Sequence, residues 1–190
     1  GVHLIDPSTG EYNRPFLEAY GVSGLAILLR GYVRVQGIMV APGNPKGIGG
    51  LSDLLGGDVR IVNRNPGSGT RVLLDLLIER EAERRGVSLE ELRRSISGYE
   101  ICVSSHGAVA AAVASGRADA GLGIEAAARA YGLDFIPLAE ERYDFLVRRD
   151  RLGKREVSLL VEILRSEEFR EALEEIPGIR PSDGMGEPVP

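Results

Sequence analysis

Cysteine, histidine and tryptophan are scarce in this sequence of 190 residues, which has one cysteine, two histidines and no tryptophan. A single cysteine cannot form a disulfide within the chain. Because Cys102 lies between Ile101 and Val103 in an apolar run, we expect it to be a small buried residue. The scattered histidine and cysteine side chains lack the spacing of metal ligands, so the sequence predicts no metal site built from them.

The sequence also lacks an excess of positive charge and any long apolar run. Its net charge of −5 argues against general affinity for nucleic acids, so an anion site would have to be built locally from amides and a few arginines. No run of about 18 apolar residues is present, and a membrane-spanning segment is not expected. The N-terminal residues lack the pattern of a signal peptide, so we expect a cytoplasmic protein without membrane partners.

Short strand-like and helix-like segments alternate along the chain, which predicts an α/β fold with mostly parallel sheets. Two strand-like stretches, residues 25–29 and 32–40, come first. Residues 42–50 form a Gly- and Pro-rich loop that we interpret as a crossover between two lobes. Residues 140–144 form a polar connector between two later strands, and the Pro- and Gly-rich residues 181–190 are expected to be a flexible tail.

A Gly-rich turn between a strand at 60–63 and a helix that opens at Ser68 is the first candidate site. Helix starts leave backbone N–H groups without partners and carry partial positive charge. Here those amides belong to Gly69, Thr70 and Arg71, next to the hydroxyls of Ser68 and Thr70 and the charge of Arg71. The combination suits a small anion. The alternative is that Ser68 is an ordinary N-cap and the glycines only form the turn.

A second junction of the same kind follows the strand at 99–104, where Ser105 is the expected N-cap of the next helix. His106 at the helix start is expected to be neutral and could donate a hydrogen bond to an oxyanion, or it could be a surface residue beside the cap. Ligands of open parallel sheets bind at the carboxyl ends of strands. Both junctions are expected at such ends and could therefore converge on one anion.

The remaining polar residues do not predict catalysis. Tyr143 lies in the polar connector, where its phenol could donate to an oxyanion or merely cover the core. Asp119 and Glu125 follow strands without a second carboxylate at catalytic spacing. The nucleophile elbow G-x-S-x-G is absent, so we expect no enzyme activity and no catalytic residues.

Five stretches in fixed order resemble the periplasmic-binding-protein-like domain linked to molybdate and tungstate: DPSTGEYN (6–13), VAPGNPKGI (40–48), NRNPGSGTR (63–71), AAAVASGRADAGLGIE (110–125) and FIPLAEERYD (135–144). The resemblance implies the type II fold, in which two α/β lobes are joined by two crossovers and hold the ligand in the cleft between them. The crossovers are expected near residues 39–43 and 138–143.

The resemblance also divides the chain. Residues 1–41 and 139–180 are expected to form lobe 1, and residues 42–138 lobe 2 with the anion-binding helix starts. Members of the family normally carry another strand–helix–strand–helix segment before the first motif. Lobe 1 is therefore expected to be incomplete, either because the sequence is a fragment or because a partner chain, a fused domain or a second copy completes it.

Oxyanion-binding relatives hold the ligand with hydroxyls and helix-start amides, often with one tyrosine from a crossover. Arg71 is added because of its charge and His106 because of its possible hydrogen bond, both at the helix starts, whereas the other residues follow from the resemblance. The expected ligand-binding set is therefore Ser68, Gly69, Thr70, Arg71, Ser105, His106, Gly123, Ile124 and Tyr143. The resemblance implies a non-enzymatic domain that binds or senses a small oxyanion, most simply molybdate or tungstate. The oxyanion itself is the expected ligand, without a further cofactor, and no direct nucleic-acid contact by this chain is expected.

Two alternatives belong to other functional classes. The first is an enzyme or accessory protein of molybdenum-cofactor synthesis that binds a phosphorylated substrate, for which His106, Asp119 and Glu125 are the available bases. The second is the effector-binding module of a transcription regulator with a small organic ligand.

Overall fold

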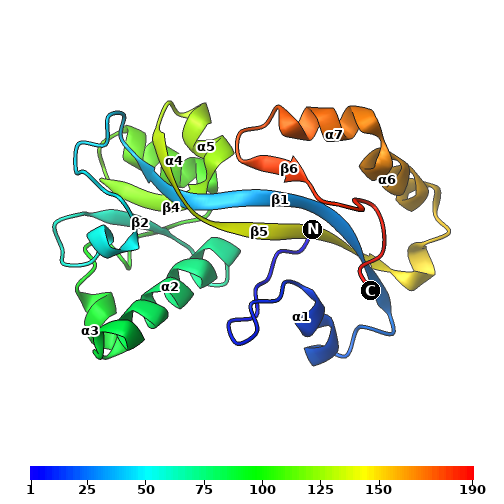
Figure 1. The fold of residues 1–190 in the computed structure, drawn as a ribbon, viewed down its shortest axis with the longest axis horizontal. Helices are drawn as coiled ribbons and strands as arrows, with labels where there is room; N and C mark the ends of the chain where they lie inside the picture. Colours follow the sequence, from blue (N-terminus) through cyan, green and yellow to red (C-terminus); the bar gives the residue numbers. More distant parts are fainter. The chain divides into compact units, whose positions relative to one another are not determined.

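The computed structural model describes residues 1–190, and its contacts divide the chain into two compact units (Figure 1). Unit 1 consists of residues 1–34 and 140–190, and unit 2 of residues 35–139. The first boundary thus lies several residues before the predicted crossover at 39–43, while the second lies within the predicted range. The first boundary carries no local signal because it falls inside a strand rather than at the Gly-rich loop.

Strands and helices alternate through unit 2, whereas unit 1 is built from elements at both ends of the chain. The helices are α1 (Arg14–Ala19), α2 (Gly69–Arg85), α3 (Leu89–Arg94), α4 (His106–Ala114), α5 (Glu125–Ala130), α6 (Arg155–Arg165) and α7 (Glu167–Glu174). The strands are β1 (Ala26–Val40), β2 (Ile61–Arg64), β3 (Cys102–Val103), β4 (Ala120–Ile124), β5 (Asp134–Arg148) and β6 (Ile179–Pro181). Short 3-10 turns occupy Leu51–Leu54 and Arg149–Arg151. None of the helices is long and apolar enough to cross a membrane.

The sheet of unit 2 has the strand order β3-β2-β4-β1-β5, to which β1 and β5 contribute the parts that lie within residues 35–139. Strand β2 runs parallel to both β3 and β4, but β1 is antiparallel to β4, from Gln36 opposite Ile124 to Val40 opposite Ala120. The sheet is therefore mixed, and the expectation of mostly parallel strands was wrong. A loop and one 3-10 turn, rather than a helix, connect β1 to β2, so β1 lies outside the alternation on which that expectation rested.

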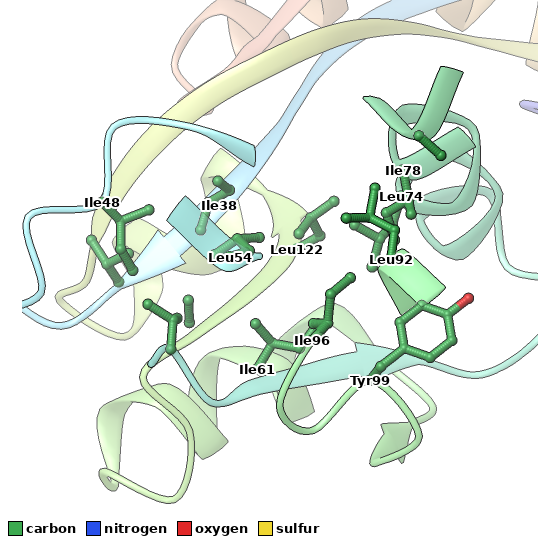
Figure 2. Packing of buried hydrophobic residues seen from close by; sticks show 14 residues of the cluster. Ile38, Ile48, Leu54, Ile61, Leu74, Ile78, Leu92, Ile96, Tyr99 and Leu122 are labelled. Carbon is green, nitrogen blue, oxygen red and sulfur yellow. The ribbon is translucent and has the colours of Figure 1, made fainter. Parts of the chain in front are cut away.

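Two layers of apolar side chains cover the two faces of this sheet. Neighbouring residues of a strand point to opposite faces, and accordingly Ile38 and Ile61 belong to one cluster while Met39 and Val62 belong to another. Helices α2 and α3 cover the first face, where Leu74, Ile78 and Leu92 pack (Figures 1 and 2). Helices α4 and α5 cover the second face. The α/β class predicted from the sequence is confirmed.

Unit 1 has a smaller core beside strand β6, which pairs antiparallel with the first part of β1. Leu164, Leu173 and Met185 are its buried residues. Met185 lies in the segment that was expected to be a flexible tail, yet only 1% of it is exposed. The N–H of Val189 donates to the carbonyl of Leu28 at 2.7 Å. The prediction of a flexible tail at 181–190 is not confirmed by this packing, because a buried methionine and backbone hydrogen bonds fix the segment to β1.

The two predicted strands at 25–29 and 32–40 are one continuous strand, β1, and the predicted polar connector at 140–144 is the interior of β5. Two acidic residues of that stretch, Glu141 and Asp144, are buried. Asp144 accepts hydrogen bonds from the side-chain amide of Asn13 at 2.7 Å and from the N–H of Gly31 at 3.1 Å. Asn13 and Gly31, which are far away in the sequence, thus supply the hydrogen bonds that allow an acidic side chain to be buried. From the local sequence alone, this polar stretch resembles a loop.

Candidate oxyanion site

Three strand-to-helix junctions of unit 2 lie at one edge of its sheet. The register places Arg64 of β2 opposite Val103 of β3, and Val62 of β2 opposite Gly121 of β4, with all three strands parallel. Their carboxyl ends therefore meet at the same edge, where helices α2, α4 and α5 begin. This is the edge at which ligands of α/β sheets bind.

Hydrogen bonds hold the first two junctions together. The N–H of Asn65 donates to the carbonyl of Val103 at 3.1 Å, and the guanidinium of Arg64 donates to the carbonyl of Ser104 at 3.2 Å. Asn63, which is buried, accepts from the N–H of Arg64 at 2.8 Å and donates to the carbonyl of Tyr99 at 3.1 Å. The turns before α2 and α4 are thus adjacent and fixed to each other, and Asn63 and Arg64, which the sequence did not single out for this role, fix them.

Ser68 is the N-cap of α2, as predicted. Its hydroxyl oxygen accepts from the N–H of Arg71 at 3.2 Å, and its carbonyl accepts from the N–H of Val72 at 3.0 Å. The amides of Gly69 and Thr70 belong to the first turn, where no intrahelical acceptor exists. The Ser68 hydroxyl hydrogen can still be donated because the oxygen acts only as an acceptor in the cap. Thr70 is buried, with 2% of its surface exposed.

Ser105 caps α4 in the same way, also as predicted. Its hydroxyl accepts from the N–H of Ala108 at 3.1 Å, and its carbonyl accepts from the N–H of Val109 at 3.1 Å. The amides of His106 and Gly107 therefore lie in the first turn of α4. Two helix starts, each with one serine hydroxyl and two amides, are placed side by side at the sheet edge.

Arg71 directs its guanidinium along α2. Its Nε donates to Asp75 at 3.0 and 3.1 Å, and the guanidinium lies 4.3 Å from the ring centre of Tyr99, whose hydroxyl also donates to Asp75. Burial acts to lower the pKa of Arg71, but the hydrogen bonds with Tyr99 and Asp75 outweigh it and raise that pKa. Both the backbone N–H and the side chain of Arg71 have partners within unit 2, and the carboxylate of Asp75 offsets the charge of the guanidinium.

Gly123 and Ile124 lie at the third junction. A Cβ atom on Gly123 would lie 2.2 Å from Cε of Met39 and 3.2 Å from Nδ1 of His106. The absence of a side chain at Gly123 thus makes room for Met39 and brings His106 close to the end of β4. Ile124 caps α5 without a side-chain hydrogen bond, and α5 has only six residues.

Tyr143 belongs to unit 1, whereas the other eight predicted residues belong to unit 2. Its ring stacks on Tyr32, with 4.9 Å between ring centres, and on His3, with 5.4 Å. The guanidinium of Arg34 lies 4.7 Å from its ring centre. Structure within unit 1 therefore gives Tyr143 an aromatic packing role, and its expected contact with an anion remains a prediction.

Cys102 does not lie in the core. It is exposed, and Nη1 of Arg71 lies 3.7 Å from its Sγ atom. Strand β3 has only two residues and forms the edge of the sheet. The expectation of a buried cysteine was wrong. The apolar run around Cys102 forms the edge strand β3, which has no neighbouring strand on its outer side, and Cys102 is exposed there.

A buried ion cluster in unit 1 was not found from the sequence. Glu141 is 2% exposed, pairs with the guanidinium of Arg34, and lies 3.3 Å from Nδ1 of His3. Burial acts to raise the pKa of Glu141, but the hydrogen bond from His3 and the charge of Arg34 outweigh it, and the pKa falls below its ordinary value. No local pattern marks these residues, because they lie far apart in the sequence.

Acid is expected to remove the stability that Glu141 contributes. Because its pKa is lowered in the folded state, this contribution is complete above the unfolded pKa and is lost as the pH falls through the folded value. Urea unfolding of the wild type and of Glu141→Gln at pH 7, 5, 4 and 3 would measure it. The difference in unfolding free energy between the two proteins should shrink as the pH falls. A difference that stays constant over this range would contradict the lowered pKa.

Residues 1–165 match the family described as the PBP superfamily domain, and the chain therefore belongs to this family of periplasmic-binding-protein-like domains. The uncharacterized protein YvgK of Bacillus subtilis (strain 168) is 38% identical over 177 residues, which cover 93% of this chain and 54% of that protein. The chain thus spans about half the length of this curated relative.

Solved structures show the same fold. L-phospholactate-bound PEB3 matches with a TM-score of 0.62 and 23% identity, over 80% of this chain and 68% of that chain. AncCDT-1, described as an ancestral amino acid-binding protein, matches with a TM-score of 0.55 and 17% identity, over 86% of this chain and 64% of that chain. These likenesses confirm the type II binding-protein fold predicted from the sequence motifs.

Proposed function

We propose that this chain is a non-enzymatic domain that binds or senses a tetrahedral oxyanion, molybdate or tungstate, through the helix starts of unit 2. One observation carries the proposal: α2 and α4 begin side by side at the carboxyl ends of parallel strands, and the N–H of Asn65 joins their two turns. Two adjacent helix starts offer several N–H donors and two partial positive charges.

The chemistry of these donors suits a small dianion. Ser68, Gly69 and Thr70 supply one hydroxyl and two amides, and Ser105, His106 and Gly107 supply the matching groups of the second helix start. Hydrogen bonds to a charged acceptor are about twice as strong as neutral ones, which offsets the removal of the anion from water. The guanidinium of Arg71 forms an ion pair with Asp75, so it is not counted among the anion donors.

Substitution of either capping serine is expected to weaken oxyanion binding. A hydrogen bond to a charged group contributes about 1.5–3 kcal/mol, so Ser68→Ala and Ser105→Ala should each raise the Kd for molybdate or tungstate by about 10- to 100-fold. Isothermal titration with molybdate, tungstate, sulfate and phosphate would measure the four affinities and show which anion is preferred.

Ser88→Ala is the matched control, because Ser88 caps α3 in the same unit with a hydroxyl that accepts from the N–H of Glu91 at 3.1 Å. This variant loses a helix cap and the corresponding stability, but it should bind oxyanions like the wild type. The proposal fails if no oxyanion produces heat with the wild type, or if Ser88→Ala weakens binding as much as Ser68→Ala.

A small organic anion is a second candidate ligand. PEB3, a protein of the same fold, has been solved with L-phospholactate, whose phosphate is also a tetrahedral oxyanion. Titration with L-phospholactate under the same conditions separates the two candidates. Tighter binding of L-phospholactate than of molybdate and tungstate would favour the organic ligand and leave the roles of Ser68 and Ser105 unchanged.

A further inference from the structure

Unit 1 contains two cavities that adjoin one another and differ in chemistry. One has a volume of about 380 Å³ and is lined by three arginines, Arg14, Arg30 and Arg142, with Glu11 and Tyr12 beside them. The other has a volume of about 450 Å³, and its lining combines aliphatic side chains with the polar residues Arg14, Glu18, Ser23 and Arg149. Arg14, Val189 and Pro190 line both cavities, so the two lie next to each other.

The first cavity, the basic cavity, concentrates positive charge in a protein whose net charge is −5. Arg142 has no ion-pair partner, and Arg14 has only an exposed pairing with Glu18 at 3.7 Å. Arg30 donates through Nη1 to the carbonyl of Asp183 at 3.2 Å, which fixes its guanidinium without neutralising it. Glu11 is the one acidic residue of the lining. The cavity therefore has unbalanced positive charge that an anionic group would satisfy.

The second cavity, the apolar cavity, lies where α1, the start of β1 and the end of the chain meet. Its aliphatic side chains include Leu17, Leu28 and Leu152, and Leu152 is 37% exposed. Burial of an apolar ligand surface here would remove both the ligand and Leu152 from water. An aliphatic or aromatic body would pack against these side chains, with Glu18 and Arg149 at the same cavity.

We propose that unit 1 binds an amphiphilic organic anion, with its carboxylate or phosphate in the basic cavity and its apolar body in the apolar cavity. Guanidinium groups form charge-assisted, often bidentate hydrogen bonds with both kinds of acid. Ligand pockets in proteins are typically about 300–1,000 Å³ and combine apolar walls with a few placed polar groups. This site lies wholly in unit 1 and is independent of the oxyanion site in unit 2.

Octyl phosphate and octanoate are suitable probes, because both carry an eight-carbon chain and differ in the acidic group. Isothermal titration should be performed on the Ser68→Ala/Ser105→Ala protein, so that the helix starts of unit 2 do not contribute. At least one probe should bind with 1:1 stoichiometry, and the better one identifies the preferred acid. Octanol lacks the acidic group and inorganic phosphate lacks the apolar chain. Each should therefore bind at least about tenfold more weakly than the better probe.

Variants then test the two cavities separately. Arg142→Gln should weaken the better probe by about tenfold or more through loss of a charge-assisted bond. Leu152→Gln should also weaken binding of the better probe, because the apolar contact with its eight-carbon chain is lost. Arg155→Gln is the control, because Arg155 is an exposed arginine of unit 1 outside both cavities. Circular dichroism should show that each variant remains folded.

Three results would overturn the proposal. The first is the absence of heat with both probes up to millimolar concentration. The second is octanol binding as tightly as the acids, which would make the arginines irrelevant. The third is an equal loss of affinity in Arg142→Gln and Arg155→Gln, which would indicate general electrostatic attraction instead of a site.

Discussion

Glu141→Gln is expected to lower the free energy of unfolding by about 3–5 kcal/mol, the usual loss when one partner of a buried ion pair is removed. Glu141 is almost fully buried, and the side chain of Arg34 is only 11% exposed. Glutamine keeps the shape of the side chain but leaves the Arg34 guanidinium without a counter-charge. His3, which lies 3.3 Å from the other carboxylate oxygen, loses its acceptor charge too.

The neighbouring Glu140→Gln provides the matched control. Glu140 pairs with Arg180 at 2.7 Å, but both side chains are more than half exposed. Exposed ion pairs contribute about 0–1 kcal/mol, so this variant should unfold close to the wild-type midpoint. Urea unfolding at pH 7, monitored by circular dichroism, would measure the free energy of unfolding of both variants. Equal effects of the two substitutions would show that burial does not govern the strength of the Glu141 pair.

Ile78→Ala is expected to lower the free energy of unfolding by about 2–5 kcal/mol, because it leaves a cavity in the main core of unit 2. Ile78 of α2 is fully buried and packs in the cluster that includes Ile38, Leu74 and Leu122 (Figure 2). The cluster joins the sheet to the helix that begins at Ser68. Loss of packing there should therefore destabilise the unit that carries the candidate oxyanion site.

Ile101→Ala makes the same chemical change in the same unit at a residue that is 56% exposed. It should cost well under 1 kcal/mol, since most of its side chain already contacts water. Urea unfolding of both variants in parallel gives the comparison. If Ile101→Ala destabilised as strongly as Ile78→Ala, the assignment of these two side chains to surface and core would be wrong.

Local signals were sufficient to predict the parts of the fold that depend on short-range chemistry. Ser68 and Ser105 were predicted as N-caps because a serine preceded each helical pattern, and both hydroxyls accept the expected backbone N–H. The adjacency of their two junctions follows from the parallel pairing of β2 with β3, which the alternation of strands and helices also predicts.

Features that depend on distant partners could not be predicted in this way. Glu141 looked like part of a polar connector, because its partner Arg34 lies more than a hundred positions away. Cys102 looked buried, because the sequence did not show that β3 would be a short edge strand. The guanidinium of Arg71 pairs with Asp75, one helical turn further on, and this local ion pair competes with the predicted direct contact to an anion.

The division of the chain has a consequence for the order in which the protein folds during synthesis. Unit 2 is one continuous stretch, whereas unit 1 needs residues 1–34 and 140–190 together. At typical rates of synthesis, Arg34 leaves the ribosome on the order of 10 s before Glu141 follows. Residue 139, the last of unit 2, emerges before residues 140–190, so unit 2 can form its core while the second segment of unit 1 is still being synthesised. Unit 2 is therefore expected to fold before unit 1.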